Sequence, residues 1–465
     1  MEIKKADLQG SLEESLVRHR VAGASVAVFH ESELITAAAG VINVNTGVEF
    51  TTDTLTLLGS ITKVFTTTLV MQLVDEGIVD LDERVVRYLP DLRLKSREAL
   101  EQITVKMLLN HTAGINGDML PDHGHDEETI EKGIARFAQF GQLFCPGADF
   151  SYSNGGMVIA GYLAQRLRGK SWYRLIRERI FEPLEMEHSA TLPEEALLHR
   201  ASVGHYLEPE SKKVVRTSVV FFPLSFSPCG TSLMTSAPDL IAFARAHMGN
   251  GMGVNGARIL SERSAKAMQR TTVNITGRGY TYIDMGLGWM VSGDGLLHHL
   301  GGNPGVRSAL YAYPAHGFAA AILTNAAHSF GLMNELMEPW LKEFGAQKPV
   351  GMVDIHFPSQ PEKIDPNKYV GVYEDVSSRF SVSPTADGLA LSRQAKVAHS
   401  ETAPTEPTQP MRLIPMGDDK FFLESDANDD GSTPDLFRIF AFRNPDARGH
   451  MRHLGNLLRL HSRVL

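Results

Sequence analysis

The sequence predicts an α+β fold in two parts. The first is a two-lobe domain, in which an antiparallel sheet flanked by helices lies beside an all-helical lobe, and the second is a small antiparallel β-barrel. Strand patterns occur near the N-terminus and again at 285–325, with helical patterns between them. A proline-rich stretch at 348–366 then precedes a run of short strands. We therefore expect domains at 1–347 and 367–465, joined by a linker at 348–366.

The first domain begins with a helix pattern at 8–19 and a hairpin pattern, in which two apolar, β-branched runs at 22–29 and 33–44 flank a short polar turn. If this hairpin pairs with the later strands in one sheet, the helices between them form a second lobe, and a cleft separates the lobes. The helices are predicted at 64–77, 105–109, 130–140, 157–168, 172–180, 239–248 and 261–269, the later strands at 287–292, 295–300, 306–313 and 318–324, and a last helix at 329–344.

After the linker, short apolar runs alternate with polar turns, a pattern typical of a small β-barrel or sandwich. The loop at 397–410 is rich in threonine and proline, so we expect it to be flexible. The strands are predicted at 369–373, 380–382, 389–392, 411–414, 420–423, 436–442 and 457–461.

Composition excludes several classes of protein. Of the 465 residues, 43% are hydrophobic and 21% are charged, as in soluble globular proteins, and the net charge of −9 disfavours nucleic-acid or anionic-membrane binding. The two cysteines, Cys145 and Cys229, cannot form a disulfide framework and favour a reducing compartment. The N-terminus lacks the apolar core of a signal peptide, and no apolar run is long enough to span a membrane, so we expect a cytoplasmic protein.

The candidate nucleophile lies in Gly59-Ser60-Ile61-Thr62-Lys63, just before the predicted helix at 64–77. A serine hydroxyl is a weak nucleophile until a neighbouring group takes its proton. Residues three apart share one face of a helix, so Lys63 could serve Ser60 as base if burial keeps its amine partly unprotonated. The alternative is structural, with Ser60 as a helix cap and Lys63 solvated in the first turn.

Two further motifs follow in order, Tyr152-Ser153-Asn154 and His299-Leu300-Gly301-Gly302. The three motifs together resemble those of the serine β-lactamase and penicillin-binding-protein superfamily, in the branch with Tyr-x-Asn and His-x-Gly as second and third motifs. Their surroundings are also similar to that superfamily, and the resemblance covers roughly residues 8–346. The supporting segments are Leu108 to Gly114, Gly230 to Leu240 and Pro304 to Ser308.

The resemblance implies a role for each motif. Ser60 would form the acyl-enzyme, Lys63 and Tyr152 would share the transfer of protons, and the backbone N–H groups of Ser60 and Gly302 would form the oxyanion hole. Asn154 would hold Lys63 or a substrate amide, or else would cap the helix that follows, and Tyr152 could instead be a core aromatic residue. No cofactor is implied, and His123-Gly-His125-Asp126 lacks the third-ligand motif of a metal site.

The third motif departs from the Lys-Thr-Gly form. His299 replaces a permanent cation with an imidazole whose charge can switch, and it would orient Tyr152 or the leaving group. His298 should face the opposite side of its strand. The change disfavours β-lactam recognition and favours ester, amide or peptide substrates. Arg307 could hold a substrate carboxylate instead, although an arginine on a strand is often simply solvated.

The sequence therefore predicts a serine hydrolase that acts on ester, amide or peptide bonds through acyl-Ser60. The alternative is an acyl transferase that resembles penicillin-binding-type thioesterases, which cyclise nonribosomal peptides, and a carrier protein would then be a partner. A third possibility is a non-catalytic binding protein on the same fold. Tyr369 to Tyr373 resembles the entry strand of a lipocalin-like domain, which could cap the cleft or serve stability or oligomerisation.

Overall fold

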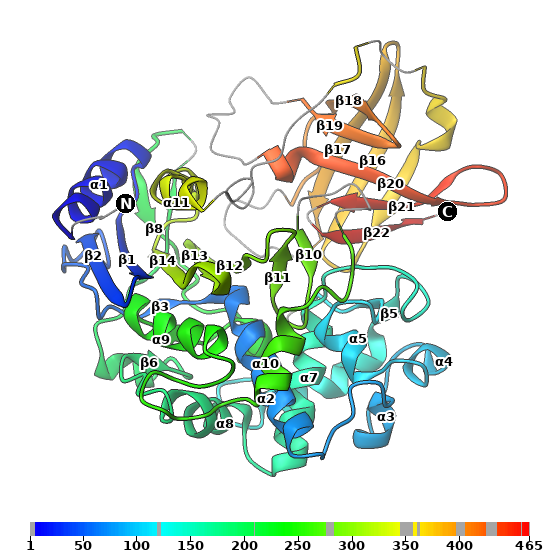
Figure 1. The fold of residues 1–465 in the computed structure, drawn as a ribbon. Coiled ribbons are helices and arrows are strands. Elements are labelled where there is room, and N and C mark those ends of the chain that lie inside the picture. The colour runs from blue at the N-terminus through cyan, green and yellow to red at the C-terminus, as the bar shows by residue number, and fades with distance from the viewer. Residues whose placement is uncertain are drawn as a thin grey trace.

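The structure is a computed structural model in which a larger α+β domain contacts a β-barrel along one side (Figure 1). This arrangement confirms the predicted fold class. The described residues are 5–118, 122–208, 210–275, 283–344, 357–359, 363–396, 405–424, 435–456 and 458–464. Among the helices in these ranges, none is both long and apolar enough to cross a membrane.

A seven-stranded antiparallel sheet organises the larger domain, in the order β10-β11-β12-β13-β14-β1-β2. As predicted, the N-terminal hairpin joins the later meander, because β1 pairs with β14 from Ala24 opposite Thr324 onward. The strands are β1 (Gly23–His30), β2 (Glu33–Gly40), β10 (Ile283–Met285), β11 (Met290–Ser292), β12 (Leu297–Asn303), β13 (Val306–Tyr313) and β14 (Phe318–Thr324).

The alternation of side chains along β14 gives the sheet two buried faces. Ala320 and Ile322 face a core that includes α1 (Lys5–His19) and α11 (Phe330–Glu343). Ala321 and Leu323 face the core shared with α9 (Ala237–Met248) and the helical lobe. The sheet is therefore covered by helices on both sides, and β12 and β13 lie at its boundary with the helical lobe (Figure 1).

The helical lobe is built around α2 (Thr62–Asp75), in which all residues except the last two are buried. A three-ten turn, η1 (Gly59–Ile61), precedes α2, so Ser60 lies on a turn rather than in the α-helix itself. The other helices are α3 (Val85–Tyr88), α4 (Arg97–Leu100), α5 (Val105–Leu109), α6 (Thr129–Ile134), α7 (Asn154–Arg168), α8 (Trp172–Ile176) and α10 (Glu262–Gln269).

Two predicted helices are shorter than expected. The helix at 130–140 ends at Ile134 and continues as a three-ten turn, and the helix at 172–180 changes to a π-helical turn at Arg177–Phe181. Short strand pairs complete the domain: β3 (Thr56–Leu57) and β6 (Ser189–Ala190) with β9 (Met234–Thr235), β4 (Ile115–Asn116) with β5 (Gly141–Gln142), and β7 (His205–Leu207) with β8 (Val214–Arg216).

The second part of the chain is a closed antiparallel barrel of eight strands. The sequence predicted seven, because β21 alternates poorly: Arg452 is exposed, and the buried neighbours of Leu454 include His453 and Asn456. The strands are β15 (Gly371–Glu374), β16 (Ser378–Thr385), β17 (Gly388–Ala395), β18 (Met411–Gly417), β19 (Lys420–Leu423), β20 (Ile439–Pro445), β21 (Met451–Asn456) and β22 (Arg459–Val464).

Most of the predicted linker lies outside the described residues, and so does much of the loop at 397–410. The domain boundaries therefore stay a prediction.

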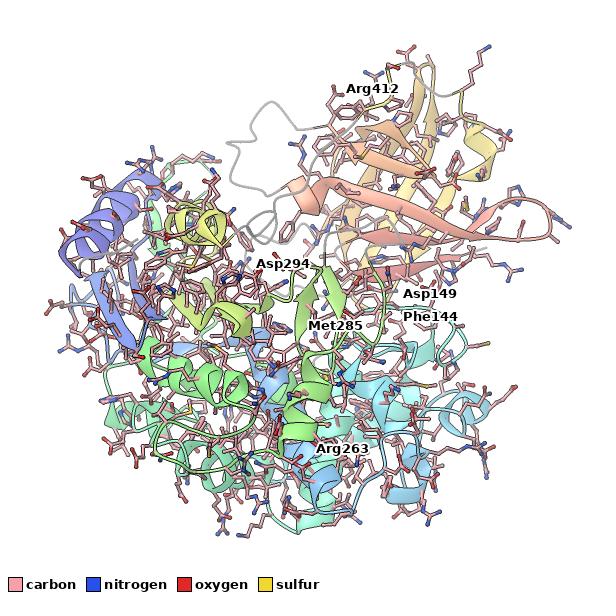
Figure 2. All side chains as sticks on the ribbon, viewed as in Figure 1. Phe144, Asp149, Arg263, Met285, Asp294 and Arg412 are labelled. Atoms are coloured by element: carbon pink, nitrogen blue, oxygen red, sulfur yellow. The ribbon has the colours of Figure 1, made fainter. Side chains whose placement is uncertain are left out.

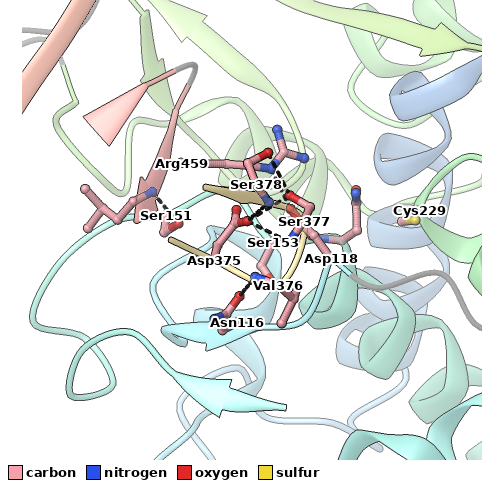
Figure 3. Close-up of polar contacts among 12 residues, drawn as sticks. Asn116, Asp118, Ser151, Ser153, Cys229, Asp375, Val376, Ser377, Ser378 and Arg459 are labelled. Atoms are coloured by element: carbon pink, nitrogen blue, oxygen red, sulfur yellow. Dashed lines mark hydrogen bonds and ion pairs between the residues drawn. The ribbon is translucent and has the colours of Figure 1, made fainter. Parts of the chain in front are cut away.

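Backbone and side-chain hydrogen bonds fix the barrel against the larger domain (Figure 3). The Val376 amide donates to Asn116 Oδ1 at 3.2 Å, and the Leu460 amide donates to Ser151 Oγ at 3.1 Å. Arg459, the first residue of β22, forms an ion pair with Asp118. The turn between β21 and β22 is thereby held beside the segment that carries Tyr152.

Candidate active site

Lys63 lies in the first turn of α2, one turn after Ser60. Its Nζ donates to Ser60 Oγ at 2.9 Å and to the Cys229 carbonyl at 2.7 Å. The lysine side chain is fully buried, and Ser60 borders a pocket. This geometry contradicts the structural alternative, in which Lys63 is solvated beside a helix cap. The Nζ and Oγ atoms are close enough to exchange a proton directly.

Glycine backbones converge on the nucleophile. Gly59 has φ +55°, and a Cβ there would lie 2.4 Å from the Gly302 amide nitrogen. Gly230 has φ +128°, and a Cβ there would lie 2.2 Å from the Gly59 carbonyl oxygen. Ser308 on β13 donates to the Leu58 carbonyl at 2.7 Å and fixes the same turn. A side chain at Gly59 or Gly230 would prevent this close packing. The packing places the Gly302 amide against Gly59, the residue before Ser60.

Tyr152 lies at the centre of the site, on an extended segment just before α7. Lys63 Nζ is 4.8 Å from the centre of its ring, and the Arg459 guanidinium carbon is 5.0 Å away. The His111 ring is 4.4 Å from it and the His299 ring 6.3 Å, measured between ring centres. Two basic side chains and two imidazoles thus surround a phenol that is only 7% exposed.

His111 holds the backbone on both sides of Tyr152. Its carbonyl accepts from the Ser151 amide at 3.1 Å, and its Nδ1 accepts from the Ser153 amide at 3.2 Å. Because Nδ1 accepts, the ring proton must be on Nε2. Burial first, and then the charge of Lys63, lower the pKa of His111 well below its usual value, so the ring is neutral. His111 also has φ +60°, which a non-glycine residue adopts only when its surroundings require it.

His299 is fully buried on β12 and borders the pocket. Its Nδ1 donates to the Leu300 carbonyl at 2.7 Å, which leaves Nε2 as an acceptor. Burial first, and then Lys63, lower its pKa to about 3. It is therefore a neutral acceptor at neutral pH, whereas the sequence suggested a ring whose charge switches. His298 does not border this pocket; its ring lies 6.4 Å from that of Tyr311, between ring centres.

Asn154 is the first residue of α7. The cap of this helix is Ser153, whose Oγ accepts from the Gly156 amide at 3.2 Å, so the alternative in which Asn154 caps the helix is wrong. The Asn154 amide donates to Asp118 Oδ1 at 2.7 Å. Asn154 borders a separate cavity of about 270 Å³, together with Asp118 and Asp375. The structure thus places Asn154 beside the Ser60 pocket rather than in its wall.

The Ser60 pocket has a volume of about 420 Å³. Arg307, on β13 opposite Gly302, lies in its wall, with its guanidinium 5.5 Å from the centre of the Phe330 ring. Burial lowers the pKa of Arg307 to about 10, so it still carries a positive charge at neutral pH. Apolar and barrel residues complete the wall, among them Phe222, Phe330, Phe437, Leu458 and Arg459.

The sequence allowed that the barrel could cap the cleft, but it did not indicate which barrel residues reach the site. Leu458 has φ +68° in the turn between β21 and β22, and its carbonyl accepts from the Tyr152 amide at 2.9 Å. Arg459, next in the chain, faces the Tyr152 ring. No local pattern around these residues indicates catalysis, because they reach the site only through domain packing. His111 did have a signal, since it lies in the segment from Leu108 to Gly114 that resembles the superfamily.

The fold, the order of the motifs and the contact of Lys63 with Ser60 define a β-lactamase-like domain. The sequence model of the Beta-lactamase family matches residues 8–337, and this chain belongs to that family. It is 35% identical over 364 residues to penicillin-binding protein 4 of Amycolatopsis lactamdurans, covering 77% of this chain and 94% of that protein.

Solved structures extend the similarity to the barrel. The chain is similar to SurE, with a TM-score of 0.79 and 26% identity over 99% of both chains. It is also similar to D-amino acid amidase from Ochrobactrum anthropi SV3, solved with L-phenylalanine amide, with a TM-score of 0.60 and 26% identity. That match covers 73% of this chain and 97% of the amidase chain. The whole two-part architecture is thus shared with SurE.

We expect His111→Ala to slow nucleophilic attack by Ser60 by roughly 10- to 100-fold, because a small displacement of a catalytic group is costly. The measurement is the rate of labelling by a fluorophosphonate across pH 5 to 9. His111→Asn keeps an acceptor for the Ser153 amide and should recover part of the rate. Labelling of His111→Ala at the wild-type rate, with the fold intact by circular dichroism, would show that His111 does not position Tyr152.

We expect the fold to lose stability below about pH 6.5, because burial lowers the pKa of both His298 and His247 to about 3. The unfolded chain binds these protons first as the pH falls, so the free energy of unfolding decreases. His298→Phe should remove about 2 kcal/mol of the loss between pH 7 and pH 5, measured by urea denaturation. An unchanged pH dependence in this variant would contradict the assignment of a neutral, buried His298.

Proposed function

We propose that this chain is an acyl transferase that takes a peptidyl group from a thioester onto Ser60 and releases it as a cyclic peptide. The observation that carries the proposal is the turn between β21 and β22, which places Leu458 and Arg459 in the wall of the pocket that holds Ser60. A wall closed by a second domain limits the access of water to an acyl-enzyme. An amine tethered to the acyl chain then has the advantage of proximity over water.

In the acylation step, Lys63 acts as a neutral amine: Ser60 Oγ attacks the thioester carbonyl while its proton passes to Lys63 Nζ, 2.9 Å away. The backbone N–H groups of Ser60 and Gly302 stabilise the charge that develops on the carbonyl oxygen. The C–S bond breaks, and the thiol leaves with a proton delivered from Lys63 through Tyr152. Acyl-Ser60 and a free thiol are the products of this step.

In the release step, the peptide's own amine attacks the ester carbonyl of acyl-Ser60. The amine loses a proton to the Lys63 and Tyr152 pair, the bond from the carbonyl carbon to Oγ breaks, and Ser60 regains its proton. An amide bond has formed and the enzyme is restored, with no oxidation or reduction. Neutral His299 offers Nε2 as an acceptor near Tyr152 throughout the cycle.

We further propose that the acyl residue has the D configuration. SurE has been solved with D-Leu, and that structure matches this chain with a TM-score of 0.75 and 26% identity over 99% of both chains. The similarity to D-amino acid amidase supports the same stereochemistry. Arg307 in the pocket wall would bind a peptide carbonyl or a carboxylate of this substrate.

A hydrolase is the second candidate. Similarity to D-amino acid amidase favours it, because water replaces the tethered amine in an otherwise identical cycle. Ester, amide or peptide bonds to a D-residue would then be the substrates.

We expect a linear peptidyl thioester with a free N-terminal amine and a C-terminal D-residue to give a product without added water. The measurement is product mass, with Ser60→Ala as the control and the L-epimer as the stereochemical comparison. An acid as the only Ser60-dependent product would support the hydrolase instead. Cyclic product from Ser60→Ala would contradict the acyl-Ser60 intermediate.

We expect Arg459→Ala to raise the ratio of hydrolysed to cyclised product by about tenfold, because removing this side chain opens the pocket wall to water. Arg459→Lys keeps the charge and most of the length, so its ratio should stay close to that of wild type. The measurement is the ratio of hydrolysed to cyclised product by mass spectrometry in the wild type and in both variants. An unchanged ratio in Arg459→Ala would show that the barrel does not control the access of water.

A further inference from the structure

A second and larger cavity lies where the barrel meets the helical lobe. Its volume is about 1480 Å³, and it is bordered by residues of the loop at 143–149, of the start of β15 and of β21 and β22. We call it the junction groove. Figure 2 shows Phe144 and Asp149 below the barrel, and Asp149 pairs with Arg443 of β20. The groove shares no lining residue with the Ser60 pocket.

The junction groove is positively charged, although the whole chain has a net charge of −9. Four arginines border it against two aspartates, Asp149 and Asp446. Both carboxylates are already engaged: Asp149 accepts from Asn444 Nδ2 at 3.2 Å and pairs with Arg443, and Asp446 accepts from nearby backbone amides. The arginines are Arg379, Arg448, Arg452 and Arg463, of which Arg379 pairs with Glu374.

Apolar side chains lie among these charges. Phe144 and Val464 border the groove, and Val464 is 45% exposed. Arg448 and Arg452 are exposed at its edge. Arginine and aromatic residues are enriched at protein interfaces, and charged rims select partners of opposite sign. The groove thus has the composition of a docking surface for an acidic protein.

β22 connects the groove to the active site. Arg459 at its start faces Tyr152, and Ser462 to Val464 at its end border the groove. At about 3.3 Å per residue, five residues of strand span about 17 Å. On the other side, the loop at 143–149 ends three residues before Tyr152. A partner seated in the groove is therefore near enough for a flexible arm to reach Ser60.

We propose that the junction groove docks an acidic carrier domain that presents the peptide as a thioester. The proposal rests on the proposed function, which requires a thioester donor. The groove binds the body of the carrier through its arginines, and the thioester arm extends along the boundary between the domains to the Ser60 pocket. Docking raises the rate of encounter and leaves the chemistry at Ser60 unchanged.

The test compares two donors of one peptide in the double variant Arg448→Glu/Arg452→Glu. The donors are an acidic peptidyl-carrier domain from a nonribosomal peptide synthetase and a small N-acetylcysteamine thioester. We expect kcat/KM for the carrier-bound peptide to fall about tenfold or more, because the variant reverses two rim charges. Turnover of the small thioester should stay within about twofold of wild type. Arg412→Glu is the matched control, since this exposed barrel arginine does not border the groove.

Cys145 gives a readout that does not depend on turnover. It is exposed and borders the groove, whereas Cys229 is buried, so a maleimide should label Cys145 selectively. The carrier domain should slow this labelling in the wild type and in Arg412→Glu, but not in the double variant. Equal carrier turnover and equal protection in all three proteins would overturn the docking site. Turnover of neither donor by the wild type would instead overturn the proposed function, and the docking proposal with it.

Discussion

The contact between Lys63 and Ser60 is the constraint on which the rest of the site depends. A buried amine needs acceptors, and Lys63 has the Ser60 hydroxyl and the Cys229 carbonyl. The carbonyl is available because the chain turns sharply at Gly230, against Gly59. That close approach in turn requires backbones without side chains at both positions. One buried polar group thus accounts for two glycines far apart in the sequence.

Tyr152 is held by both parts of the protein. His111, from the helical lobe, accepts the amides of Ser151 and Ser153, and Leu458, from the barrel, accepts the amide of Tyr152 itself. Three consecutive backbone N–H groups are therefore satisfied by residues outside their own segment. Such a segment cannot move without losing several buried hydrogen bonds, and rigidity of this kind suits a group that must receive and return protons.

The sequence predicted most of the fold because its helices and strands carry clear periodic patterns. It also predicted Ser60, Lys63, Tyr152 and His299 as neighbours, and the structure brings these four together. It could not predict that His299 is neutral, because that follows from burial, a property of the packed molecule. It missed Arg459 for a similar reason: a lone arginine in a short strand has no local signal, and only the docking of the barrel gives it a place beside Tyr152.

The hydrogen bond from the Tyr152 amide to the Leu458 carbonyl has a thermodynamic consequence. Because barrel docking and the geometry of the site share this bond, they are linked equilibria. Whatever binds only the assembled site must also favour the docked barrel, by a free energy set by its concentration relative to its dissociation constant. A ligand at Ser60 therefore stabilises the docking of the barrel against the larger domain. The melting temperature of the barrel then reports ligand occupancy at a serine almost four hundred residues earlier in the chain.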